Sequence, residues 1–156
     1  MSLQSQVYTS IAIGAPGAKA DLNVFDYYPQ SLAAEEDVAA GTFVWAGSDP
    51  ERLAGYGGSG EPLGFVERNI VYPNYDVDGE GTMIIHEGET LTIATCGCFY
   101  AVADTDAAVG QAVFAFTANG SITVNDPGAT VADAVETGWK VITAGEAGET
   151  IIIKRS

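Results

Sequence analysis

The stretch Ala112-Val-Phe-Ala-Phe-Thr-Ala-Asn-Gly-Ser-Ile-Thr-Val124 decides the fold class of this chain. Apolar and β-branched residues flank Asn119-Gly120 on both sides. An Asn-Gly pair in such a setting is the strongest short-range signal for a β-hairpin, because both residues tolerate a positive φ. We therefore expect two antiparallel strands, Ala112–Thr117 and Ser121–Val124, joined at this turn.

Similar apolar runs recur along the chain between Gly-, Pro-, Asn- and Asp-rich turns. Several of them alternate with period two, as half-buried strands do. Further strands are expected at residues 42–46, 63–72, 82–86, 90–95, 99–102, 139–143 and 150–154. We also expect a second hairpin around Glu87-Gly-Glu89 and one helical turn each at Ser31–Ala40 and Val131–Glu136. The predicted fold is all-β, an antiparallel β-barrel or jelly-roll-like sandwich.

The chain also contains an internal echo. Asp37-Val-Ala-Ala-Gly-Thr-Phe-Val-Trp-Ala46 aligns without gaps on Asp106-Ala-Ala-Val-Gly-Gln-Ala-Val-Phe-Ala115. Both segments describe an acidic turn, a glycine that lets the chain change direction, and a strand entering the core. The echo indicates two equivalent corners of one barrel, or an old duplication.

Charge is abundant and unevenly placed. The 156 residues include 21 Asp and Glu against 6 Lys and Arg, for a formal net charge of -15. Residues 1–34 contain one lysine and two aspartates, so nearly all of this charge falls in residues 35–156. We predict an extended N-terminal arm over residues 1–34 and a single β-barrel or sandwich domain over residues 35–156.

The composition excludes several classes of partner. Neutralising a nucleic-acid backbone takes clustered Lys and Arg, which this acidic chain lacks. No apolar run approaches the roughly 20 residues of a spanning helix, and no polybasic stretch could hold an anionic membrane. We expect neither nucleic acid nor membrane as a partner. The first residues lack a secretory signal pattern, which predicts synthesis in the cytoplasm.

Residues that carry catalysis are scarce. His86 is the only histidine, and its setting in an apparent strand favours a structural role. Cys96 and Cys98 are read as two small thiols without a disulfide, and they cannot complete a soft-metal site with one histidine. Gly55–Gly60 fits the dinucleotide fingerprint, but Glu61-Pro62 follows where its helix should begin. We expect no enzyme activity, no cofactor and no metal.

A family resemblance adds to this interpretation. The two Asp-x-x-x-Gly segments, Leu63-Gly-Phe-Val66, Gly88-Glu-Thr-Leu-Thr-Ile93 and the terminal run from Gly138 to Lys154 resemble the head-decoration or structural cement proteins of tailed bacteriophages. The resemblance covers about residues 35–155. It implies a non-enzymatic accessory protein that binds the outer surface of an assembled capsid and cements neighbouring major capsid subunits. The implied location is the virion exterior.

The weakly charged arm is the expected contact region. Its aromatic residues Tyr8, Phe25, Tyr27 and Tyr28 are candidate capsid-contact residues, because aromatic side chains often anchor interfaces. The other interpretation is that the arm adds one or two strands to the barrel. A symmetric capsid position favours a homo-oligomer, either a dimer or a trimer.

Two other functions are weighed against capsid decoration. The chain could be a β-sandwich carbohydrate-binding or adhesin module, with Trp45, Tyr56 and Trp139 as a platform on which sugars stack. Both tryptophans lie in apolar strands, which favours burial over display. An acid-catalysed hydrolase would need a deep cleft lined by carboxylates.

Overall fold

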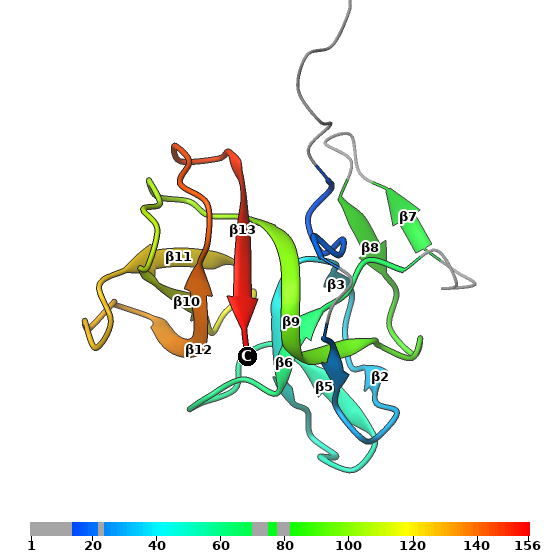
Figure 1. Ribbon diagram of the computed structural model, residues 1–156. Helices are drawn as coiled ribbons and strands as arrows, with labels where there is room; N and C mark the ends of the chain where they lie inside the picture. Colours follow the sequence, from blue (N-terminus) through cyan, green and yellow to red (C-terminus); the bar gives the residue numbers. More distant parts are fainter. Residues whose placement is uncertain (1–13, 22–23, 70–74, 78–81) are drawn as a thin grey trace, which may run out of the picture.

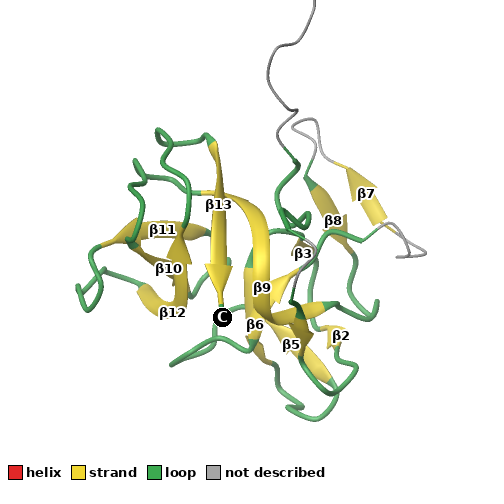
Figure 2. Cartoon of the chain, viewed as in Figure 1, coloured by secondary structure: helices red, strands yellow, loops and turns green. Residues whose placement is uncertain are grey.

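A computed structural model describes residues 14–21, 24–69, 75–77 and 82–156 of the chain. These residues form strands and loops and contain no helix (Figure 2). The strands are β1 (Asp26–Tyr27), β2 (Ala33–Ala34), β3 (Val38–Ala39), β4 (Phe43–Ala46), β5 (Leu53–Gly55), β6 (Gly64–Val66), β7 (Tyr75–Val77), β8 (Met83–Ile85), β9 (Ile93–Val102), β10 (Ala112–Phe116), β11 (Ile122–Asn125), β12 (Ala134–Val141) and β13 (Thr150–Arg155). The all-β prediction is confirmed, and the strands form a sandwich-like arrangement instead of a closed barrel.

The main sheet has the strand order β11-β10-β12-β13-β9-β6-β4-β5-β2, with β1 also paired to β9. A smaller sheet has the order β3-β8-β7. All pairs are antiparallel except β2 with β5. The long strand β9 lies between the two halves of the molecule, with β13 beside it (Figure 1).

The two halves of the main sheet repeat one pairing scheme. Strands β4, β5, β6 and β9 adopt the same relative order as β10, β11, β12 and β13. The residues aligned in the echo also pair with equivalent strands: Phe43 of β4 pairs with Phe65 of β6, and Ala112 of β10 pairs with Lys140 of β12. The echo seen in the sequence therefore marks two equivalent strand entries, β4 and β10, in two copies of one unit.

An aromatic cluster joins the two units. Trp139 of β12 lies with its ring centroid 6.0, 5.7 and 5.9 Å from those of Phe43, Phe65 and Phe99. All four side chains are buried. Tilted and edge-on aromatic pairs of this kind contribute about 0.5–1.5 kcal/mol each beyond the burial of their area. A second cluster, which includes Leu32, Met83 and Ile85, fills the space beneath the small sheet.

The hairpin predicted at Asn119-Gly120 is confirmed. Strand β10 pairs with β11, and the Phe116 N–H donates to the Ser121 carbonyl. Gly120 alone has a positive φ, of +66°, whereas Asn119 accepts the Ser121 N–H through its Oδ1. The turn thus depends on one left-handed residue and on the two hydrogen bonds that Asn119 Oδ1 accepts from the N–H and the hydroxyl of Ser121.

Three local predictions are wrong. Residues 31–40 form β2 and β3 instead of a helical turn, and residues 131–136 form a turn that leads into β12, because these backbones pair across the sheets. Glu87-Gly-Glu89 is a turn without a hairpin, since β8 pairs with β3 and β7 whereas β9 pairs in the main sheet.

Strand β9 runs unbroken through Cys96-Gly97-Cys98, where Gly97 has a φ of +131°.

Two glycines provide a matched test of this fold. An added Cβ at Gly120 would overlap the Phe43 backbone oxygen, whereas one at Gly110, which has a φ of +90°, would meet nothing within 4 Å. We expect Gly110→Ala to cost about 1–2 kcal/mol, from the left-handed backbone alone. Gly120→Ala should cost about 1–3 kcal/mol more, because of the overlap. Denaturant unfolding measures both, and equal losses would contradict the close packing of the turn on β4.

Candidate functional site

Three of the four candidate contact residues lie against the body of the protein. Tyr8 is outside the described residues. Phe25 and Tyr27 are half-buried and pack on the aromatic cluster, whereas Tyr28 packs on the second cluster. The Phe25 ring meets the Phe99 ring edge-on at 5.3 Å. Their contact with another protein stays a prediction, and the structure shows that they also hold residues 24–28 in place.

Lys19 also contacts the segment of residues 24–28. Its Nζ lies 4.7 Å from the centre of the Phe25 ring, 5.7 Å from that of Tyr27 and 3.4 Å from Oε1 of Glu67. The hydrogen bond with Tyr27, together with the charge of Glu67, raises the pKa of Lys19. The backbone here pairs with β9, since the Ala20 and Gly17 N–H groups donate to the carbonyls of β9. Residues 17–20 and 26–27 thus add strand pairing to β9.

The three aromatic residues considered as a sugar-binding platform, Trp45, Tyr56 and Trp139, do not form one. Trp45 and Trp139 are 3% and 1% exposed, so neither ring can stack on a ligand. The Trp45 indole N–H donates to the Gly60 carbonyl at 2.9 Å. The Tyr56 hydroxyl accepts the Ala39 N–H and bonds the Thr42 hydroxyl, and burial raises its pKa. These three residues support the fold.

Two aspartates close equivalent turns. Asp37 Oδ1 accepts the Glu87 N–H at 3.0 Å, and Asp106 Oδ1 accepts the Ala147 N–H at 2.9 Å. The residues that follow pair in the same way, Val38 with Ile85 and Ala107 with Gly145. The acidic residue of each echo segment thus acts as a clip between two loops of its own unit. His86 Nδ1 lies 3.4 Å from Asp37 Oδ1 and belongs to the first clip.

The second clip organises an acidic loop cluster that we call the acidic tip, residues 104–110 and 145–149. Ala107 and Gly145 exchange backbone hydrogen bonds of 2.8 and 3.1 Å, which fix the two loops side by side. Val109 is 68% exposed at this tip. The exposed carboxylates of the tip are Asp104, Asp106, Glu146 and Glu149.

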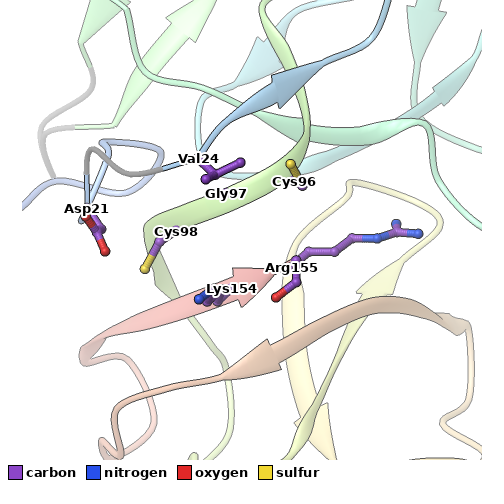
Figure 3. A pocket seen from close by; sticks show the side chains of 8 residues that line it. Asp21, Val24, Cys96, Gly97, Cys98, Lys154 and Arg155 are labelled. Carbon is purple, nitrogen blue, oxygen red and sulfur yellow. The ribbon is translucent and has the colours of Figure 1, made fainter.

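A surface of opposite character lies near the C-terminal ends of β12 and β13. Lys140 and Lys154 are exposed and stand directly opposite each other across the two strands. Beside Lys154 a cavity of about 230 Å³ opens between Val24 and the Cys96-Gly97-Cys98 segment of β9 (Figure 3). We call the two lysines and this cavity the lysine face. One carboxylate, Asp21, also lines the cavity, and the nearby Arg155 is paired with Glu61 at 2.7 Å.

The thiols of the lysine face are free and form no disulfide with each other. Burial, chiefly, together with the nearby charge of Asp21, raises the pKa of Cys98 and so keeps this thiol protonated at neutral pH. No group of three or more His, Cys, Asp and Glu side chains gathers as a metal site within the residues that the structure describes.

The lysine face was not predicted from the sequence. Lys140 follows Trp139 in one strand and Lys154 follows three isoleucines in another, so alternation already indicates that both point outward. The signal that they lie opposite each other is the register of the β12–β13 pair, which no local pattern fixes.

Comparisons with known proteins place the chain among phage head proteins. A sequence model of the XM1 gp53 minor capsid protein family matches residues 3–155. A chain in the capsid of Myoviridae phage XM1 superposes with a TM-score of 0.63 at 15% identity, over 99% of this chain and 97% of that chain. The head fiber gp8.5 N base of bacteriophage phi29 gives a TM-score of 0.51 at 12% identity, over 85% and 95%. These two likenesses show the fold alone. The search of curated proteins found no match.

No helix of the described residues is long and apolar enough to cross a membrane.

The first clip makes a pH-dependent prediction. The N–H of Glu87, and to a lesser extent His86, holds the pKa of Asp37 below its usual range. Stability from this group is therefore present above the unfolded-state pKa of about 3.9 and is lost as pH falls through the lower folded-state pKa. We expect Asp37→Ala to lower the Tm at pH 7, and the difference from the unaltered protein to shrink below about pH 4.

Asp126→Ala is the control, since this exposed carboxylate belongs to neither clip, and it should leave the Tm nearly unchanged. Asp106→Ala removes the equivalent bond of the second unit and should lower the Tm at pH 7. A Tm difference for Asp37→Ala that persists undiminished at pH 2 would contradict the assignment.

Proposed function

The chain belongs to the XM1 gp53 minor capsid protein family and so is a structural protein of a phage capsid, and we propose that it binds the outer surface of the assembled shell and cements neighbouring major capsid subunits. The observation that carries the proposal is the family match over residues 3–155, which includes the arm as well as the body. The resemblance to phage head proteins noted in the sequence is thereby confirmed. The proposal gives the protein no enzymatic role.

The charge distribution supports an exterior position. A net charge of -15 disfavours a place beside packaged nucleic acid, whose backbone is itself anionic. On the outer surface the same charge faces solvent and keeps particles from associating. The protein is accordingly made in the host cytoplasm and carried on the virion exterior.

The arm supports a cementing role. Residues 1–13 contain Leu3, Val7 and Tyr8 and no charged side chain, unlike the acidic body. Pairing of residues 17–20 with β9 fixes the point from which this segment leaves the body. Residues 1–13 are long enough to reach beyond the protein that carries them, at up to about 3.3 Å per extended residue. Tyr8 in particular is assigned to the shell, with Phe25, Tyr27 and Tyr28 at the base of the arm.

Removal of residues 2–13 tests this role directly. Truncation at residue 14 spares the aromatic packing of Phe25 and Tyr27, so the body should keep its Tm. We expect the full chain to sediment with empty major capsid shells and to raise the temperature at which they come apart, and the truncated chain to lose at least tenfold in affinity, or about 1.4 kcal/mol. A chain with residues 2–13 in scrambled order is the control for length and composition.

The outcomes separate the parts of the proposal. Normal binding by the truncated chain would contradict the role of the arm in the contact, but it would not contradict binding of the protein to the shell. Failure of the full chain to bind shells, or protection from antibody on intact virions, would contradict the exterior position. Binding without any gain in shell stability would contradict cementing.

A further inference from the structure

The lysine face and the acidic tip have properties that neither the fold nor the shell requires. Lys140 and Lys154 are like charges directly opposite on a solvated sheet face, an arrangement that destabilises the sheet. Neither lysine has an ion-pair partner among the described residues, although the chain contains 21 carboxylates. The pair is therefore available for carboxylates from outside.

The acidic tip combines negative charge with an exposed apolar side chain. No Lys or Arg occurs among residues 104–110 and 145–149, so the tip contains no positively charged side chain of its own. Val109 is 68% exposed among these carboxylates. The tip thus presents an apolar side chain ringed by negative charge, and the lysine face presents an apolar cavity flanked by positive charge.

The sizes agree. The cavity of about 230 Å³ is lined by the small and apolar residues Val24, Cys96, Gly97 and Cys98, and by the polar residues Asp21, Lys154, Arg155 and Ser156. An apolar cavity of about 150 Å³ accepts a benzene molecule, so the three carbons of a valine side chain fit within this one. Val109 matches the cavity in chemistry as well, because the surface exposed inside it is mostly apolar.

The two surfaces cannot meet within one chain. The tip precedes β13 at Thr150, whereas Lys154 lies near its other end, and each strand residue advances about 3.3 Å. Strand β13 is held straight by pairing with β12 on one side and β9 on the other (Figure 1). The hairpin therefore cannot bring its own tip onto its own lysines.

We propose that the acidic tip of one copy of this chain docks on the lysine face of a second copy, with Val109 entering the cavity and Asp104 and Glu146 meeting Lys140 and Lys154. The contact is head to tail. A two-fold contact through the lysine face would place lysines against lysines, whereas a head-to-tail contact pairs opposite charges and can close into a ring. It also offsets the repulsion between copies that each have a net charge of -15. The proposal concerns the free protein and does not depend on binding to the shell.

A charge swap tests the contact. The variant Lys140→Glu/Lys154→Glu and the variant Asp104→Lys/Glu146→Lys each place like charges across it. The four substitutions together restore opposite charges and return the net charge to that of the unaltered chain. Asp106 and Glu149 are left in place because Asp106 forms the clip and Glu149 accepts the Glu146 N–H. Sedimentation equilibrium of the free protein at low salt, with circular dichroism to verify folding, measures the result.

We expect the unaltered chain to self-associate, each double variant to weaken association at least tenfold, and the fourfold variant to recover it. High salt should weaken the unaltered assembly. Val109→Asp should also prevent association, with Val24→Ala as a milder change on the cavity side. A monomeric unaltered chain, association of both double variants at its full strength, or a folded fourfold variant that stays monomeric would overturn the proposal. Shell binding by monomeric double variants would overturn nothing in the proposed function.

Discussion

The contact between Trp139 and the phenylalanines Phe43, Phe65 and Phe99 is the interaction on which the rest of the structure depends. Each ring comes from a different strand, Trp139 from β12 of the second unit and the three phenylalanines from β4, β6 and β9 of the first, so the cluster ties the two repeated units together. Strand β9 serves both units, with its first residues paired to β6 and its last to β13. A change that loosened this cluster would separate the units as well as weaken them.

The surfaces follow from the same strands by alternation. Trp139, Val141 and Ile153 point into the core, and therefore Lys140 and Lys154 point away from it. Phe99 is covered by Phe25, which secures the base of the arm on the far side of β9. The aromatic core thus fixes where residues 24–28 lie and where the lysine face lies.

Local signals predicted the longer strands of this fold, missed short strands such as β1, β2, β3 and β5, and predicted strand partners poorly. Asn119-Gly120 identified the β10–β11 hairpin, because the turn and both strands are neighbours in sequence. The turn at Glu87-Gly-Glu89 looked the same in sequence but joins different sheets, since Asp37, 50 residues away, holds it. The echo of Asp37 and Asp106 correctly indicated equivalent corners. The aromatic residues of the arm could be noticed but not placed, and the opposed lysines depended on a register that sequence patterns leave open.

A cryo-electron microscopy reconstruction of the intact virion tests the central claim most directly. The account predicts density with this fold on the outer surface of the shell, with residues 1–13 extending onto a major capsid subunit other than the one beneath the body. Density for this chain on the inner surface, or on a single subunit without contact to its neighbours, would contradict the account.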